Sequence, residues 1–426
     1  MASTLASTVT ILRLHFAATL FCAFVIVGLF VANYFRILPS IGIAGLGLTA
    51  ISYALVYKRV ANRQQWPLFG SFIVIYGIHL LSGLNTEAAN MGEYYRDVVL
   101  QLPFVVLPLA FWVLPALPAQ KLENLWRLFI GCVVVSALIS TGYYLLHAAA
   151  INEIYLHSKI MPTEPDHIRF SLMVTLAVAV GVVLLNWGRN TTAWRVALLM
   201  AVIYLALFQH LLAVRSGLVT LYAVGGMYFL WLVLRAKHYR RAAYLTGCLL
   251  LLPAVSYLCF PTFRNKFINT QEDLGKVSDT QAANNYSLVA RVYSYKAAWA
   301  IMKQNPVTGV GKADMQDEMA RQFRQHYPEI AESSYLLPHN QFIYDLVAFG
   351  LLGTLLFAVC FYYPAFWAWP QFAPLLVAQY TLVTLSFLVE YTLETQIGLT
   401  FSLFFLLLSL NGLLPAPDES QQWRPA

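Results

Sequence analysis

Two arginines and a histidine are the first candidates for chemistry, and Arg215 and His339 stand at the ends of apolar stretches, where a charged side chain is costly. Arg215 lies in Leu-Leu-Ala-Val-Arg-Ser-Gly-Leu-Val, with almost no polar sequence around it, and Arg291 opens an amphipathic segment. A charge inside a bilayer costs about 2.5–3.5 kcal/mol or more and therefore often marks a functional site. The alternative for Arg215 is that its guanidinium reaches the lipid headgroups, and for Arg291 that it is a solvated loop charge. Together the two guanidiniums could bind a pyrophosphate through forked hydrogen bonds.

The next apolar run begins at Pro338-His339-Asn340 and supplies a candidate base. Histidine ordinarily titrates near neutral pH, so His339 could accept a proton from a substrate hydroxyl, or it could be a structural residue. Asn340 could bind sugar hydroxyls or cap the helix that follows. Glu390 lies near the end of another apolar run and is expected to pair with one of the arginines. Glu390 and Glu394 have the spacing of a divalent-metal pair, but structural pairing is favoured.

A polar connection at 161–169 contains Glu164, Asp166 and His167. These side chains could hold a metal, although a solvated loop is the favoured interpretation, and Arg169 could add to an anion pocket. The chain contains no phosphate-binding loop, dinucleotide glycine motif or HExxH zinc helix, so ATP-driven chemistry is not indicated. All five cysteines lie in or at the ends of apolar runs, which suggests no disulfide framework. No metal site and no cofactor are predicted.

The composition requires that membrane helices position these residues. The chain has 426 residues, of which 59% are hydrophobic and only 11% charged, whereas soluble domains carry about 25% charged residues. We therefore predict an all-α polytopic membrane protein with about 12 transmembrane helices and one large periplasmic loop that contains short helices. The expected spans are 11–34, 38–57, 66–83, 98–117, 123–148, 168–187, 193–213, 216–235, 242–260, 340–363, 372–392 and 396–413, of which the third and the twelfth are short.

The distribution of basic residues predicts the orientation. If the N-terminus is cytoplasmic, the short inside loops carry 11 Lys and Arg and the short outside loops carry 5. The positive-inside rule then places both termini in the cytoplasm and the long loop outside. We divide the chain into nine helices at 1–260, a periplasmic loop at 261–338, and three helices with a short cytoplasmic tail at 339–426. The net charge of +7 is mostly a topology signal, so no nucleic-acid partner is expected.

The long loop has recognisable parts. Residues 265–287 are polar with weak periodicity, and residues 287–302 predict an amphipathic helix with Val292, Tyr295, Trp299 and Met302 on one face. Pro306 and the glycines at 309 and 311 end this helix, and a charged helix is predicted at about 313–326. The aromatic residues suit a helix that lies on a membrane surface.

These motifs together resemble the O-antigen ligase/polymerase superfamily. Arg291, Trp299 and Pro306 with Gly309-Val-Gly311 match its loop pattern, and His339-Asn340-Gln-Phe followed by Gly350-Leu-Leu-Gly353 is similar to its second signature. Arg215-Ser216-Gly217 resembles the arginine that the family carries at the outer mouth of its central helices. The specific motifs cover about residues 210–355. Val214 departs from the pattern, because a serine often precedes this arginine.

The resemblance implies an inner-membrane glycosyltransferase with a periplasmic active site. An O-antigen ligase moves a glycan from undecaprenyl pyrophosphate to a sugar of lipid A–core. Arg215 and Arg291 would bind the pyrophosphate, and His339 would assist the acceptor hydroxyl. Asn340, Glu390, Arg169 and Trp299 are the expected substrate-binding residues. The implied mechanism is an inverting, metal-independent single displacement.

Three other functions remain open at this stage. An O-antigen polymerase uses another lipid-linked repeat as acceptor and commonly has two sizeable outside loops, whereas this chain has one. A protein O-oligosaccharyltransferase usually carries more C-terminal outside sequence than Pro415–Ala426 provides. A membrane transporter fits the number of spans, but the chain shows no inverted repeat, and its polar candidates cluster at one boundary.

Overall fold

The computed structural model describes residues 2–57, 63–157, 159–186, 191–371 and 373–414, and within these ranges the regular structure is helical. The α-helices are α1 (Ala2–Val31), α2 (Leu38–Tyr57), α3 (Trp66–Ser82), α4 (Met91–Leu100), α5 (Pro103–Val113), α6 (Ala119–Leu146), α7 (Ala148–Ile154), α8 (His167–Leu185), α9 (Thr192–Leu212), α10 (Arg215–Leu234), α11 (Tyr239–Cys259), α12 (Pro261–Gly275), α13 (Ser287–Gln304), α14 (Met315–His326), α15 (Gln341–Ala368), α16 (Pro374–Phe387) and α17 (Gln396–Asn411). Short 3₁₀ turns are η1 (Arg63–Gln65), η2 (Gly83–Asn85), η3 (Ala88–Asn90), η4 (Tyr155–His157), η5 (Gln281–Asn284), η6 (Glu332–Ser334), η7 (Trp369–Gln371) and η8 (Thr392–Glu394).

The predicted fold class is confirmed. Over the described residues, 10 helical segments are long and apolar enough to cross a membrane, and α16 and α17 are shorter apolar helices. These helices correspond to the twelve predicted spans. The third, expected to be short, runs from Trp66 to Asn85, and the fourth begins at Ala88 rather than near residue 98. Its first part, α4, contains charged residues, so an apolar window detects it too late.

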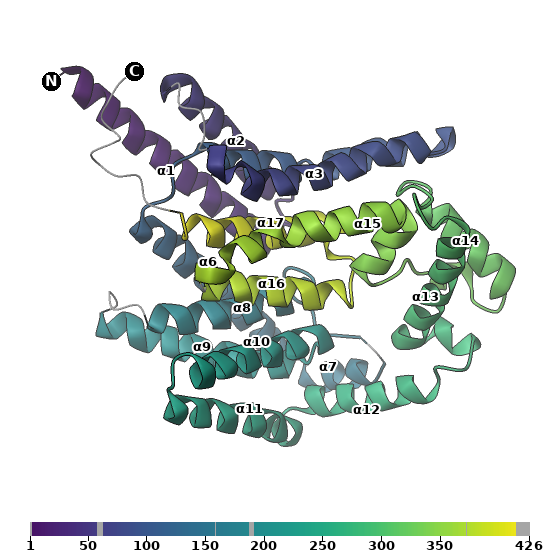
Figure 1. Cartoon of the computed structure of the whole chain (residues 1–426). Helices are drawn as coiled ribbons and strands as arrows, with labels where there is room; N and C mark the ends of the chain where they lie inside the picture. The colour runs from purple at the N-terminus through teal and green to yellow at the C-terminus, as the bar shows by residue number, and fades with distance from the viewer. Residues whose placement is uncertain (1, 58–62, 158, 187–190, 372, 415–426) are drawn as a thin grey trace.

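The spans lie side by side, and α12, α13 and α14 gather at the end of the bundle away from the start of α1 (Figure 1). The helix α17 is buried at every position from Gly398 to Asn411, with α5 and α16 packed against it. An apolar helix that is buried on all sides contacts protein rather than lipid. This position explains why 16 residues suffice for α17, since protein rather than lipid surrounds most of its length.

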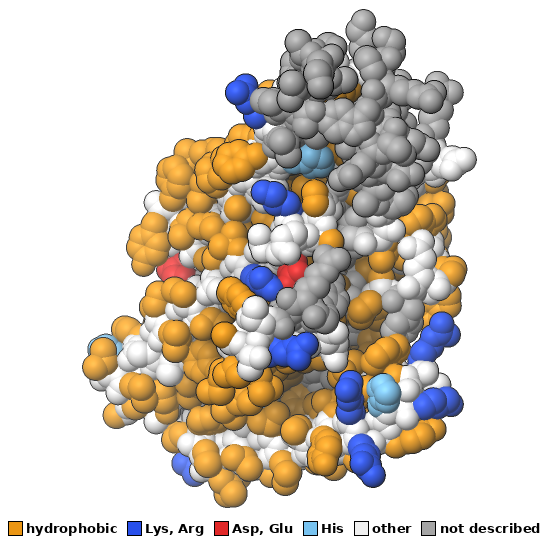
Figure 2. Space-filling model, turned by 90° about the vertical axis from the view of Figure 1, so that its left-hand side faces the viewer, with side chains coloured by type: hydrophobic (Ala, Val, Ile, Leu, Met, Phe, Trp, Pro, Cys, Tyr) orange, Lys and Arg blue, Asp and Glu red, His pale blue; other side chains and the backbone are white. Residues whose placement is uncertain are grey.

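The opposite end of the molecule faces the viewer in Figure 2. Hydrophobic side chains cover most of it, and Lys and Arg side chains are more frequent there than Asp and Glu. The connection between α10 and α11 lies at this end and contributes basic residues at 235, 237, 240 and 241. The predicted inside-loop residues Lys58, Arg59 and Arg189 and the predicted tail at 415–426 lie outside the described residues.

The chain between α16 and α17 contains only the short 3₁₀ turn η8, although a span to residue 392 was expected. The helix α16 ends at Phe387. Polar side chains from other helices bind the backbone of the turn that follows. Gln341 accepts a hydrogen bond from the Leu393 amide (3.0 Å), and Gln101 donates to the Leu393 carbonyl (3.2 Å). Irregular backbone at membrane depth is stable only with such partners. The turn therefore places Glu390 and Glu394 on different partners instead of on one helical face.

The segment between α11 and α15 contains the two predicted helices and one that was not predicted. The helices expected at 287–302 and about 313–326 are α13 and α14. The polar stretch after Pro261 forms α12. The expected apolar face of α13 is not the one that packs on the protein: Ala290, Tyr293, Ala297 and Ile301 are buried, whereas Trp299 on the opposite side is 56% exposed. That this segment is a separate periplasmic unit stays a prediction.

Candidate functional site

The loop after α13 is fastened to a kink in α15. Gly350 has a φ of +65°, which breaks the helix, and a side chain there would clash with the Val307 carbonyl. The freed backbone pairs with the loop: Val310 donates to Val347 (2.9 Å) and Gly311 donates to Ala348 (2.9 Å). The motif of Pro306, Gly309, Gly311 and Gly350 thus fixes the position of the loop on the membrane helices, because these residues allow two backbones to touch.

His339 and Arg291 meet at one carboxylate. Nδ1 of His339 lies 3.0 Å from Oε1 of Glu390, although its alignment falls short of a hydrogen bond, and Nη2 of Arg291 lies 3.8 Å from Oε2. The carboxylate is buried, and both partners are partly exposed. The hydroxyl of Tyr295, one turn after Arg291, donates to the His339 carbonyl (2.7 Å). The expected pairing of Glu390 with an arginine is confirmed, and it brings the candidate base next to a candidate phosphate ligand.

Arg215 begins α10 and is held by α12. A left-handed residue, Ala213 (φ 50°), ends α9 and turns the chain into α10 within two residues. The guanidinium donates to Thr270 (2.9 Å) and Asn269 (3.3 Å) and pairs with Asp273 (2.9 Å). Its side chain is 34% exposed, whereas Asp273 is fully buried. Arg215 therefore keeps one side open to a ligand while its orientation is fixed.

Lys266 of α12 links the two arginines electrostatically. Burial and the positive charge of Arg215 lower the pKa of Lys266 to about 8, Asp273 opposes them, and Arg291 adds a smaller lowering effect. Arg215 and Arg291 are thus close enough to the same ammonium to repel it. We call the group of Arg215, Lys266, Arg291, Asp273, His339 and Glu390 the arginine site.

The other predicted residues lie around this site in different roles. Asn340 caps α15, with its oxygen accepting from the Ile343 amide (3.1 Å) and its nitrogen donating to Leu388 (3.1 Å). Capping was one of its two expected roles, and sugar binding stays a prediction. Arg169 pairs with Asp166 and donates to Thr395 (3.1 Å). Trp299 points outward, where Lys303 lies 5.6 Å from its ring. These positions do not test substrate binding by Arg169 or Trp299.

Tyr391 lies at the meeting point of several of these charges. Its ring centre is 5.0 Å from that of His339. Arg169 donates to Thr395 (3.1 Å), so it reaches the turn that carries Tyr391 and Glu390 and lies at the edge of the arginine site.

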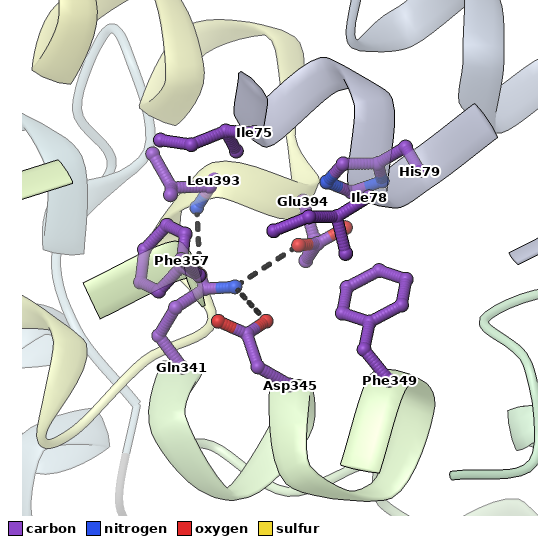
Figure 3. A pocket seen from close by; sticks show the side chains of 9 residues that line it. All are labelled: Ile75, Ile78, His79, Gln341, Asp345, Phe349, Phe357, Leu393 and Glu394. Carbon is purple, nitrogen blue, oxygen red and sulfur yellow. Dashed lines mark hydrogen bonds between the residues drawn. The ribbon is translucent and has the colours of Figure 1, made fainter. Parts of the chain in front are cut away.

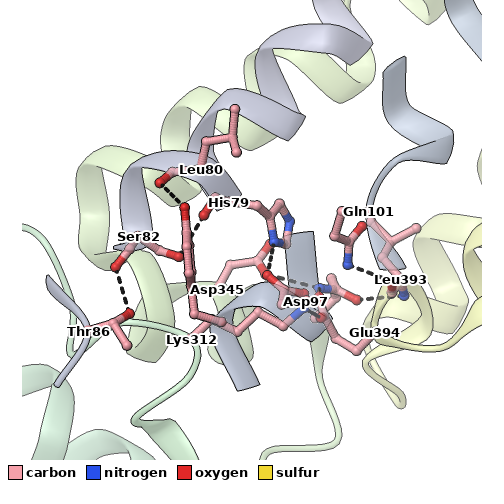
Figure 4. Close-up of polar contacts among 12 residues, drawn as sticks. His79, Leu80, Ser82, Thr86, Asp97, Gln101, Lys312, Asp345, Leu393 and Glu394 are labelled. Carbon is pink, nitrogen blue, oxygen red and sulfur yellow. Dashed lines mark hydrogen bonds and ion pairs between the residues drawn. The ribbon is translucent and has the colours of Figure 1, made fainter. Parts of the chain in front are cut away.

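A second group of charges is buried beside the loop (Figure 4). Lys312 follows Gly311 and forms ion pairs with Asp97 of α4 and Glu394 of η8. His79 of α3 lies 2.9 Å from the second oxygen of Asp97. Burial alone would lower the pKa of Lys312, but the carboxylates of Glu394 and Asp97 outweigh it and raise the pKa above its usual value. These contacts join the loop directly to α4 and η8 and, through Asp97, to α3.

Gln341 continues this group toward α15, as Figure 3 shows. Its amide nitrogen donates to Asp345 (2.9 Å) and to Glu394 (3.0 Å). The same residues line a small cavity with about 10 Å³ of space for the centre of a water molecule. We call Lys312, Asp97, Glu394, His79, Gln341 and Asp345 the Lys312 cluster. Because Glu390 and Glu394 share one short turn, the Lys312 cluster holds the turn that carries the carboxylate partner of His339.

Several of these residues were not predicted from the sequence. Lys266 and Asp273 lie in a stretch without apolar periodicity, and Asp97 lies in a helix whose start was placed too late. Lys312 directly follows a motif glycine, but its partner Asp97 is 215 residues away. Their only signal was charge close to an apolar boundary, which many solvated residues share.

Residues 200–358 match the family model described as O-antigen ligase. This part of the chain is therefore similar to the O-antigen ligase family. The match confirms the predicted resemblance, and it includes Arg215, Lys266, Arg291, Lys312 and His339. No curated protein matches the chain. The family indicates ligase chemistry of a glycosyltransferase kind, with lipid-linked glycans as the general class of substrate and a multi-pass membrane setting.

Proposed function

We propose that the chain transfers a glycan from undecaprenyl pyrophosphate to a sugar hydroxyl of lipid A–core. The observation that carries this proposal is that His339 and Arg291 share the Glu390 carboxylate, at 3.0 Å and 3.8 Å. A proton acceptor and a phosphate ligand next to each other are what a transfer from a diphosphate to a hydroxyl requires. The O-antigen ligase domain at 200–358 supports the choice of substrates.

Each residue of the arginine site has its own role in the proposed reaction. The acceptor hydroxyl attacks the anomeric carbon while its proton passes to Nε2 of His339, since Nδ1 faces Glu390. The anomeric carbon–oxygen bond breaks, and its electron pair leaves with undecaprenyl pyrophosphate. Glu390 stabilises the imidazolium that forms, as a carboxylate does in catalytic triads. Arg215 and Arg291 neutralise the charge that develops on the leaving group.

This division makes the proposed reaction independent of metal ions, because fixed guanidinium groups supply the charge that a divalent cation would otherwise supply. Attack from the face opposite the pyrophosphate inverts the anomeric configuration. The site would lie on the periplasmic side of the inner membrane. The basic side chains at the end where α10 and α11 connect support this orientation, since that end would face the cytoplasm.

The test is transfer by the purified chain in liposomes. Undecaprenyl-pyrophosphate glycan is supplied with and without lipid A–core, and the products are separated on a gel. Glycan that appears on lipid A–core only when this acceptor is present supports the ligase. Lengthening of the lipid-linked glycan without acceptor indicates a polymerase instead, and the absence of any covalent product revives the transporter.

A variant pair tests the base. His339→Ala should lower the transfer rate by about 10²–10⁴-fold, the usual contribution of general base catalysis. His326→Ala, which changes an exposed histidine of α14, should transfer at the wild-type rate. Equal rates for the two variants would remove His339 from the mechanism.

A further inference from the structure

The helix α12 buries polar side chains. Its buried residues are Thr262, Lys266, Asn269 and Asp273, which form one polar stripe at helical spacing. Its exposed side is mixed, with Phe267, Ile268 and Leu274 exposed together with Arg264, Gln271 and Glu272. A helix outside the spans normally buries its apolar side. The buried polar stripe of α12 therefore suits a helix with a polar ligand on its inner side.

Three members of the stripe have protein partners. Thr262 donates to the Leu211 carbonyl (2.7 Å), Asn269 donates to the Leu156 carbonyl (3.3 Å), and Asp273 pairs with Arg215 (2.9 Å). Lys266 differs, because among the described residues no hydrogen bond or ion pair engages its ammonium, although the residue is only 9% exposed. Buried lysines usually have an anionic partner, so the ammonium of Lys266 is available to bind an anionic ligand.

The surroundings of Lys266 identify the kind of ligand. Arg215 from α10 and Arg291 from α13 act on it, as do Asp273 from its own helix and His167 from the start of α8. Two fixed guanidiniums repel the ammonium, and a single carboxylate, already paired with Arg215, opposes them. An anion with more than one negative charge would remove this repulsion. A diphosphate presents such charge over a length that several cations can share.

We propose that Lys266 is a third cation of the diphosphate site, and that the polar stripe of α12 presents it to the lipid-linked diphosphate between Arg215 and Arg291. The identity of the lipid-linked donor rests on the function proposed above, whereas binding of a diphosphate does not.

Lys266 also gives the site a pH dependence that arginines lack. Because the pKa of Lys266 is about 8, the ammonium is charged at pH 7 and mostly neutral at pH 9 in the empty site. Only the charged form attracts a diphosphate, so its affinity should fall as the pH rises through 8. An arginine at the same position stays charged over this range.

The experiment measures binding of inorganic pyrophosphate to the full chain in nanodiscs by calorimetry, at pH 7 and at pH 9. At pH 7, Lys266→Met should raise the Kd by about tenfold or more, the effect of one charge-assisted hydrogen bond. Lys266→Arg should keep wild-type affinity at pH 7 and retain it at pH 9, where wild type weakens toward Lys266→Met. Lys159→Met, which changes an exposed lysine near η4, is the matched control.

Two results would overturn the proposal. One is a wild-type Kd for Lys266→Met at pH 7. The other is an equal loss of affinity from pH 7 to pH 9 in wild type and Lys266→Arg, since both experience the same titration of pyrophosphate and of His167. Binding is measured without transfer, so a chain that binds pyrophosphate through Lys266 but glycosylates no lipid A–core refutes only the proposed ligase reaction.

Discussion

The arginine site and the Lys312 cluster use the same kinds of side chain with opposite balance. In the arginine site three cations face two carboxylates, and Arg215 and Arg291 remain 34% and 28% exposed. In the Lys312 cluster one cation faces the carboxylates of Asp97 and Glu394, and all three side chains are less than 10% exposed. An excess of partly open positive charge attracts an anionic ligand, whereas closed ion pairs hold helices together. The difference separates a binding site from a structural joint.

The largest effect is expected from breaking the structural joint. Lys312→Met leaves Asp97 and Glu394 buried without their cation, and breaking such a pair typically costs about 3–5 kcal/mol. We expect a lower midpoint of thermal unfolding in detergent and less folded protein in membranes. Adding Asp97→Asn should restore part of the loss, and Lys296→Met, at an exposed position of α13, should change nothing. A wild-type midpoint for Lys312→Met would mean that the cluster is not a structural joint.

Removing a cation from the arginine site should lower the transfer rate but leave the stability of the fold unchanged. Arg291→Ala should lower kcat for transfer by about 10²–10³-fold, the cost of losing one donor to a developing negative charge. Its unfolding midpoint should stay near wild type, because the 3.8 Å pair with Glu390 is loose and partly exposed. Measuring the transfer kinetics and the unfolding midpoint on the same preparation tests both expectations. Stability loss without a kinetic defect would show that Arg291 has the structural role.

Alkaline pH should separate the two regions. The pKa of Lys312 is raised, so its stabilising contribution is complete below the unfolded value of about 10.5 and declines only above the folded one. The pKa of Lys266 is lowered to about 8, so its attraction for an anion declines from pH 8 upward. From pH 7 to pH 9, the affinity for pyrophosphate should fall about tenfold, following the charged fraction of Lys266. The difference in unfolding midpoint between wild type and Lys312→Met should stay constant over the same range.

The smallest effect is expected from removing metal ions. If fixed cations supply the charge in the arginine site, a chelator should leave the transfer rate unchanged in the reconstituted assay. The control repeats the assay with added magnesium. A rate that falls on chelation and returns with magnesium would contradict a site that works by arginine and lysine alone.

The membrane helices were predictable because each apolar run is a local property. A run of about 20 apolar residues can satisfy its backbone in lipid only as a helix, so the position of most spans follows from the chain itself. The end of the eleventh span was not predictable, because the turn that holds Glu390 and Glu394 depends on Gln341 and Gln101 from other helices. The helix α12 was missed for a related reason, since its polar stripe is buried against partners from elsewhere in the chain, Arg215 and the carbonyls of Leu211 and Leu156.

The sequence by itself determined that this protein is a bundle of membrane helices, that Arg215 and His339 lie at their boundaries, and that Glu390 needs a cationic partner. Each of these conclusions follows from the cost of placing a charge near lipid, which any single residue reveals. Only the tertiary structure decided that His339 and Arg291 share Glu390, that Lys266 stands near both arginines, and that Lys312 closes on Asp97. Coulombic interactions depend on distance in space, and the residues that meet here are far apart along the chain.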